Sequence, residues 1–237
     1  MVLPLYLAMT GSEIRHKNHI SRPIAWMACQ FSPYSQGITN VPECLPPESI
    51  LILNDRMPCQ GHSPSLVAQQ IKKAADQLQC ESILLDFQQV PNPESEAMTA
   101  YLAEHIAHPL YISGTYGKHL TCGIFLPPPP LHEPMSDYLD QWRGRQIWME
   151  TGLFQETVTI TREGTTYTPQ FPPDGLDGGH FDQTLCCRYQ AILSDDEIRF
   201  LLYDTADTLP HKWRLAQECG VSRILGLYQE LGQMTLS

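Results

Sequence analysis

The sequence predicts an α/β protein: a single (β/α)8 barrel of the TIM type, with reduced helices and a β-hairpin insertion after the seventh strand. Short apolar runs rich in β-branched residues alternate with polar or helix-like stretches, which is typical of a parallel sheet. Continuous Ile and Leu runs at 50–53 and 83–85 are typical of strands covered on both faces. The length of 237 residues is that of one such barrel, so we expect one domain over residues 1–237.

The helices are predicted from capping signals and apolar spacing. Pro64 at a first helical position, with Ser63 as its cap, begins the clearest helix. Others are expected at about 94–107, 135–142 and 207–219, the last ending before Gly220. Too few residues separate the fifth and sixth strands for a full helix. The eight predicted strands are 2–9, 23–31, 49–55, 82–88, 109–114, 121–126, 145–150 and 222–229.

Residues 154–204 interrupt the alternation of strands and helices. One segment there alternates β-branched and polar residues about a turn at Glu163-Gly164, which predicts a hairpin. A second hairpin is predicted with its turn at 194–196. Residues 172–182 between them are predicted to be a loop rich in Pro, Gly and Asp. Pro127 to Pro130 is expected to be a stiff extended strap across the barrel rim.

Composition excludes several classes of partner. The formal net charge of -11 makes nucleic acid and anionic membrane unlikely ligands, and no apolar run is long enough to span a bilayer. The first residues indicate a strand rather than a signal peptide, and the eight dispersed cysteines indicate reduced thiols, so we expect a cytoplasmic protein. Neither zinc spacing nor a phosphate-binding or dinucleotide glycine motif is present, and no metal or cofactor is expected.

Polar residues at the predicted strand ends indicate where a site would form. In a barrel the site lies at the carboxyl ends of the strands. Since side chains alternate along a strand, Ser82, Leu84, Asp86 and Gln88 share one face, and Asp86 and Gln88 are expected to point into the barrel mouth. A buried Asp needs a hydrogen-bond partner, which Gln88 can provide.

The segment from Cys80 to Pro91 resembles the fourth strand of glycoside hydrolase family 18, whose motif is D-x-x-D-x-D-x-E followed by a Val-Pro or Ile-Pro step. The stretch from Tyr203 to Tyr228 resembles the closing helix and eighth strand of that family. The resemblance implies a barrel whose mouth binds an N-acetylated saccharide. It also implies that Asp86 orients the acetamido group, whose carbonyl is the nucleophile in the family.

The motif departs from the family at three positions. Glu81 and Leu84 replace its first two acids, and Gln88 replaces the glutamic acid that protonates the leaving oxygen. An amide does not titrate, and loss of such a general acid typically costs about 10²–10⁴-fold in rate. We therefore expect a catalytically impaired, glycan-binding pseudoenzyme.

Two other functions are consistent with the sequence. An active glycosidase would use Asp86 with Glu150 or Glu230, because many retaining glycosidases place carboxylates at the ends of strands four and seven. Alternatively Glu150 is a rim carboxylate or an ion-pair partner of Arg145 or Lys118. A third interpretation is a non-catalytic protein-interaction module in which the hairpins of 154–204 occupy the mouth.

Further substrate-binding residues are expected among polar strand ends and aromatic side chains. Gln30 and Asn54 end the second and third predicted strands. Tyr6, Tyr116 and Tyr228 are candidates to stack on a sugar ring, although such residues are more often packed in a core or at a rim.

Overall fold

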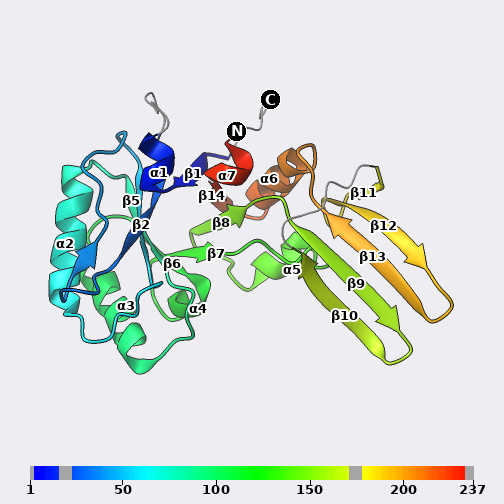
Figure 1. Ribbon diagram of the computed structural model, residues 1–237, viewed down its shortest axis with the longest axis horizontal. Helices are drawn as coiled ribbons and strands as arrows, with labels where there is room; N and C mark the ends of the chain where they lie inside the picture. The colour runs from blue at the N-terminus through cyan, green and yellow to red at the C-terminus, as the bar shows by residue number, and fades with distance from the viewer. Residues whose placement is uncertain (1–2, 16–22, 171–177, 233–237) are drawn as a thin grey trace.

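The computed structural model describes residues 3–15, 23–170 and 178–232, and within them it has a closed barrel of eight parallel strands (Figure 1). Neighbouring strands follow the order β1-β14-β8-β7-β6-β5-β4-β2, and pairing of β1 with β2 closes the ring. A short antiparallel strand, β3 (Ile38–Thr39), extends the sheet beside β2. The predicted fold class is confirmed. The barrel strands are β1 (Leu5–Met9), β2 (Ala25–Phe31), β4 (Ile50–Asn54), β5 (Ser82–Asp86), β6 (Leu110–Ser113), β7 (Gly123–Leu126), β8 (Ile147–Thr151) and β14 (Val221–Leu227).

Each barrel strand overlaps its predicted range, but two of them end two residues early. β5 ends at Asp86 rather than at residue 88, so Gln88 lies in the following loop. β14 ends at Leu227, and Tyr228 begins a helical turn, α7 (Tyr228–Leu231), instead of ending the strand. Residue 2 of the first predicted strand lies outside the described residues.

The four predicted helices are present, and the described residues contain three further short helices that were not predicted. Ser63 accepts a hydrogen bond from the Leu66 amide and caps α2, and Gly220 follows the last long helix with a φ of +94°. Between the fifth and sixth barrel strands there is one short turn of helix, as expected. None of the described helices is both long and apolar enough to cross a bilayer. The helices are α1 (Gly11–Arg15), α2 (Pro64–Gln77), α3 (Pro93–His105), α4 (Gly114–Gly117), α5 (Met135–Asp140), α6 (Leu209–Glu218) and α7.

Alternate residues of the strands form two apolar layers, as the pattern of β5 shows. Ile83 and Leu85 are buried on the outer face, together with side chains of α2 and α3. Leu84 points the other way and packs inside the barrel with Ile52 and Trp148, which are also buried. A parallel strand that is apolar on both faces is therefore covered on both faces.

The amino-terminal end of the barrel is closed by a polar and aromatic cluster. The Tyr6 hydroxyl donates to Glu81 Oε2 at 2.6 Å, and Arg223 forms an ion pair with the same carboxylate. The Arg223 guanidinium lies 5.1 Å from the centre of the Trp148 ring, and that ring stacks on Tyr111 at 3.7 Å. Burial would raise the pKa of Glu81, but the hydrogen bonds from Arg223 and Tyr6 lower it. This cluster fills the end of the barrel opposite the mouth.

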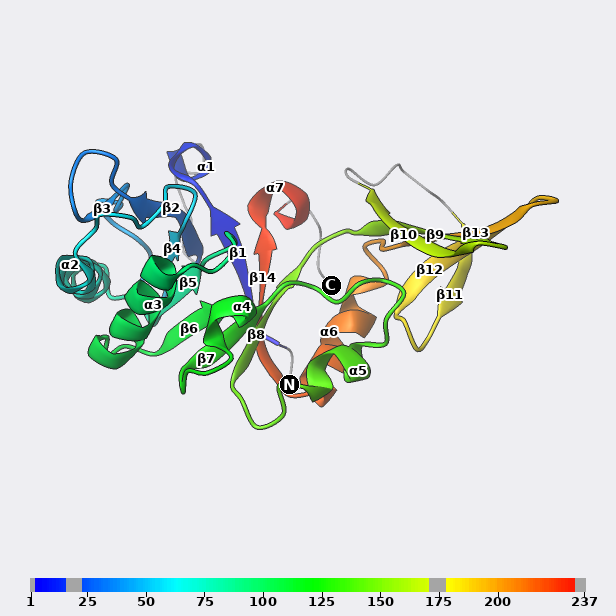
Figure 2. The same ribbon diagram turned by 90° about the horizontal axis from the view of Figure 1, so that it is seen from below.

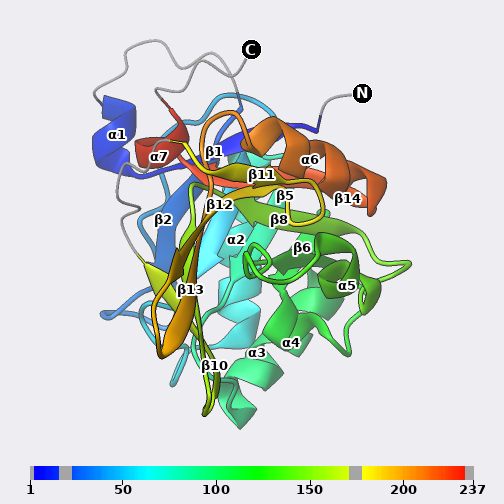
Figure 3. The same cartoon turned by 90° about the vertical axis from the view of Figure 1, so that its right-hand side faces the viewer.

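The insertion between β8 and α6 is a separate five-stranded antiparallel sheet, ordered β10-β9-β13-β12-β11. It projects from the barrel beyond α5 and α6 (Figures 2 and 3). Both predicted hairpins are present, whereas part of the predicted loop at 172–182 is a strand, and residues 171–177 lie outside the described residues. The strands are β9 (Gln155–Thr161), β10 (Gly164–Gln170), β11 (His180–Asp182), β12 (Cys187–Leu193) and β13 (Glu197–Tyr203).

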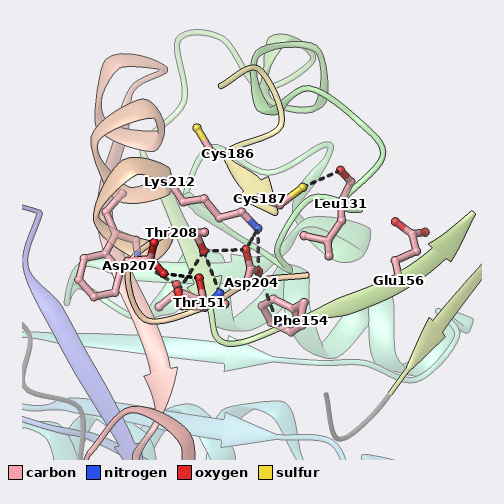
Figure 4. Close-up of polar contacts among 12 residues, drawn as sticks. Leu131, Thr151, Phe154, Glu156, Cys186, Cys187, Asp204, Asp207, Thr208 and Lys212 are labelled. Atoms are coloured by element: carbon pink, nitrogen blue, oxygen red, sulfur yellow. Dashed lines mark hydrogen bonds and ion pairs between the residues drawn. The ribbon is translucent and has the colours of Figure 1, made fainter. Parts of the chain in front are cut away.

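A buried ion pair joins the insertion to the barrel (Figure 4). Lys212 Nζ on α6 lies 2.8 Å from both carboxylate oxygens of Asp204, whose side chain is fully buried. Asp204 also accepts hydrogen bonds from Thr208 Oγ1 at 3.3 Å and from the Phe154 amide at 3.3 Å, and its own amide donates to the Phe154 carbonyl at 2.8 Å. The two ends of the insertion, Phe154 and Asp204, are thereby fixed to each other and to α6.

Candidate functional site at the barrel mouth

The carboxyl ends of the strands surround a cavity of about 390 Å³, which lies within the range of about 300–1,000 Å³ typical of ligand pockets. Its floor is apolar, with Leu84, Phe125 and Leu225. Its rim is acidic, with Glu13, Asp55, Asp86 and Glu150 beside one basic residue among those that line it, Arg56. The site is thus at the end of the barrel where the sequence placed it.

Asp86 lies at the mouth with Gln88 as its partner. Gln88 Nε2 donates to the two carboxylate oxygens at 3.3 and 3.2 Å, and Ser113 Oγ lies 3.5 Å from Oδ1. Burial is the main cause that raises the pKa of Asp86, and the negative charge of Asp55 adds to it. The hydrogen bonds from Gln88 and Ser113 act in the opposite direction.

The loop that carries Gln88 is held by Asp55, the residue that follows β4. Asp55 accepts hydrogen bonds from the amides of Gln88 and Gln89, each at 2.9 Å, and its carbonyl accepts one from the Gln89 side chain. The neighbouring Asn54 donates to the carbonyls of Met27 and Cys29, both at 2.9 Å, where the pairing of β2 with β4 is irregular. Asn54 therefore lines the cavity with an amide whose two N–H groups are already used.

Glu150, near the end of β8, is the most perturbed carboxyl at the mouth. Burial raises its pKa to about 7, and the negative charges of Asp86 and Glu230 contribute. None of the described residues donates a hydrogen bond to it or forms an ion pair with it. Arg145, one of the partners considered for it, donates instead to the carbonyls of Leu120 at 2.6 Å and Cys122 at 2.7 Å.

Two further hollows adjoin the central cavity, and Glu150 lines all three. One, of about 570 Å³, lies against the strap Pro127–Pro130 and the base of the insertion, where Glu230 is exposed. The other, of about 490 Å³, contains Ser113, Lys118 and Trp142 and shares Asp86 with the centre. The three hollows therefore adjoin one another at Glu150. None of the described residues of 154–204 lines the central cavity. The described parts of the two hairpins therefore do not occupy the central cavity.

No known family model and no curated protein matches the sequence. Solved structures do match in three dimensions. The spore cortex-lytic enzyme SleL of Bacillus cereus superposes with a TM-score of 0.55 at 11% identity over 94% of this chain and 70% of that chain. A class V chitinase mutant from Nicotiana tobaccum, in complex with NAG4, gives 0.62 at 10% identity over 95% and 93%. The family 18 N-acetylglucosaminidase of Paenibacillus barengoltzii gives 0.56 at 9% identity over 98% and 96%.

The chain has the fold of glycoside hydrolase family 18. This agreement covers nearly the whole chain, whereas the resemblance in sequence was confined to residues around β5 and around α6 and β14. Within the family 18 fold, Asp86 and Gln88 lie at the mouth, and Glu81 at the start of β5 belongs to the opposite end.

The remaining candidate binding residues lie away from the central cavity. Tyr6 is at the amino-terminal end with Glu81, and Tyr116 is buried outside the barrel, where its hydroxyl donates to the Gln89 carbonyl at 3.0 Å. Gln30 is half-buried near the end of β2, and neither it nor Tyr228 lines the central cavity. Gln229 lines the cavity where Tyr228 was expected, because α7 begins at the end of β14 and turns the tyrosine away.

No metal site is apparent in this part of the chain. No three His, Cys, Asp or Glu side chains within residues 3–15, 23–170 and 178–232 are grouped to bind an ion.

Proposed function

We propose that this barrel binds an N-acetylated saccharide across its mouth, and that it lacks the proton donor of family 18 because residue 88 is a glutamine. The observation that carries the proposal is the placement of Asp86. Its carboxylate lies in a cavity with an apolar floor and an acidic rim, and two further hollows adjoin that cavity.

An acetamido group fits the chemistry of this position. Its N–H is a donor, and the carboxylate of Asp86 is an acceptor whose protein partners are the amide of Gln88 and the hydroxyl of Ser113. A hydrogen bond to an ionised acceptor is stronger than one between neutral groups. The apolar floor at Leu84 and Phe125 suits the methyl group and the faces of the sugar ring.

The neighbours in fold support the same class of ligand. The Nicotiana tobaccum chitinase mutant was solved with NAG4, and a Cycas revoluta family 18 chitinase mutant was solved with (GlcNAc)4. Two further hollows adjoin the central cavity in this chain, which gives room for a ligand of more than one sugar.

A comparison of two tetrasaccharides tests the proposal. N-acetylglucosamine tetramer should raise the melting temperature of the protein in a concentration-dependent manner, because a ligand that binds only the folded state stabilises it. Cellotetraose has the same β-1,4 linkage without acetamido groups and should raise it much less. Equal shifts, or no shift with either, would contradict the proposal.

A further inference from the structure

Asp86 and Glu150 line the same central cavity from two different strands. β5 and β8 are separated by β6 and β7 in the barrel, so their carboxyl groups approach the central cavity from different sides of the ring. Asp86 and Glu150 also line the adjoining hollow that contains Ser113. A ligand that crosses the mouth therefore passes between two carboxyl groups.

The surroundings of these two groups favour different protonation states. Burial raises the pKa of Asp86 as well, but the hydrogen bonds from Gln88 and Ser113 oppose that rise and stabilise its ionised form. Glu150 has no such partner among the described residues and is flanked by negative charge, so burial keeps its pKa near 7. Two carboxyl groups with different pKa values can take different roles in one reaction. The group with the higher pKa acts as the acid, and the other stays ionised and stabilises positive charge.

We propose that Glu150 is the proton donor of a residual glycosidase activity, with Asp86 as the ionised carboxylate that stabilises the sugar. This inference rests on the proposed saccharide binding at the mouth. Glu150 lies at the junction of the three hollows, so its carboxyl group is beside the middle of a bound chain, where a glycosidic oxygen would lie.

The reaction is a hydrolysis that balances without a cofactor. The protonated Glu150 gives its proton to the glycosidic oxygen as the bond from that oxygen to the anomeric carbon breaks, and the electron pair stays on the departing sugar. The Asp86 carboxylate stabilises the positive charge that develops at the anomeric carbon. A water molecule then forms the new carbon–oxygen bond and gives its proton to Glu150, which restores the acid.

The charged groups around Glu150 decide whether it holds its proton. Asp86 and Glu230 raise its pKa, and no cation among the described residues pairs with it. Glu156, which lines the hollow against the strap, is already bound to His132, with a distance of 2.8 Å from its Oε1 to Nδ1. Besides Asp86 and Glu150, the ionisable residues that line the same three hollows are Glu13, Asp55, Arg56, Lys118, His132, Tyr138, Glu156 and Glu230.

The test measures binding and turnover separately on the whole chain. Cleavage of N-acetylglucosamine tetramer is followed by chromatography of the products, and its affinity is measured by calorimetry at 4 °C over a time too short for cleavage. The wild type, Glu150→Gln and the control Glu163→Gln, at the exposed turn of the β9–β10 hairpin, are compared at pH 6. A pH–rate profile of the wild type gives a second measurement that needs no variant.

The assignment predicts turnover in the wild type and in Glu163→Gln. In Glu150→Gln the rate should fall by about 10²–10⁴-fold, while the affinity changes by less than threefold. The wild-type rate should also fall as the pH rises past about 7. Three results would overturn the role of Glu150 and leave saccharide binding intact. These are binding without any turnover, an unchanged rate in Glu150→Gln, and a wild-type rate that does not fall at high pH. Absence of binding overturns both proposals.

Discussion

Gln88 Nε2 donates to both carboxylate oxygens of Asp86, at 3.3 and 3.2 Å. The amide therefore lies where a glutamic acid would share a proton with Asp86. Asp55 fixes its backbone through the Gln88 and Gln89 amides, so a change of side chain at this position should leave the loop in place.

Replacing Gln88 by glutamic acid should increase hydrolysis of N-acetylglucosamine oligomers. The new carboxyl group would lie against Asp86, and two close carboxyl groups retain one proton between them, which provides an acid at neutral pH. We expect a rate at least tenfold above the wild type by product chromatography. Gln88→Leu is the control and should give no increase, while an equal rate in Gln88→Glu would show that the oligomer is not cleaved beside residue 88.

The raised pKa of Glu150 predicts a pH-dependent stability. The folded chain holds this proton up to about pH 7, whereas the unfolded chain releases it near the ordinary value of 4.5. Stability gained from Glu150 is therefore complete below about pH 4.5 and is lost as the pH rises to about 7. At about 1.4 kcal/mol per pH unit, the wild type should lose up to about 3 kcal/mol relative to Glu150→Gln.

Denaturant unfolding of the two proteins at pH 5 and pH 8 measures this effect. The difference in unfolding free energy between Glu150→Gln and the wild type should be larger at pH 8 than at pH 5. A difference that is the same at both pH values would mean that Glu150 titrates normally in the folded protein.

Removing Lys212 should strongly destabilise the junction of barrel and insertion. Lys212→Met leaves Asp204 buried without its counter-charge, which typically costs about 3–5 kcal/mol. Lys73→Met, an exposed lysine of α2, is the control and should change the unfolding free energy by less than about 0.5 kcal/mol. Adding Asp204→Asn to Lys212→Met should recover part of the loss, and a double variant no more stable than Lys212→Met would contradict the explanation by unpaired charge.

Saccharide affinity should fall in acid as Asp86 becomes protonated. Burial raises the pKa of Asp86 above its ordinary value of 3.8, so the acceptor for the acetamido N–H is lost at a higher pH than for an exposed aspartate. Calorimetric titration with N-acetylglucosamine tetramer from pH 7 downward should show weakening before the protein unfolds. Affinity that stays constant to the acid unfolding transition would exclude Asp86 as the ionised acceptor.

The barrel was predictable because its strands are apolar on both faces, as at 50–53 and 83–85, and such strands occur in parallel sheets. The ends of the strands were less predictable. The alternation in β5 continues to Gln88, but Asp55 binds the amides of Gln88 and Gln89, which are then not free to pair with the next strand. β11 was missed because residues 180–182 gain their extended form by pairing with β12, and their Gly-rich surroundings predicted a loop.

A residue of the candidate site was predictable only where its position along a strand determines which end of the barrel it reaches. Asp86 ends β5 and reaches the mouth, while Tyr6, the second residue of β1, lies at the other end with Glu81. The position of Tyr6 near the start of its strand, and not its aromatic ring, decides that it lies away from the mouth. The raised pKa of Glu150 could not be predicted from the sequence, because it depends on burial and on the approach of Asp86 and Glu230 in three dimensions.

Calorimetric titration of the wild type and Asp86→Ala with N-acetylglucosamine tetramer at pH 7 tests the central claim most directly. Loss of one hydrogen bond to a charged group, worth about 1.5–3 kcal/mol, should weaken binding by roughly 10–100-fold. Asp195→Ala, at the exposed turn of the β12–β13 hairpin, should bind like the wild type. Equal affinity of Asp86→Ala and the wild type, or no binding by the wild type, would contradict a saccharide site built on Asp86.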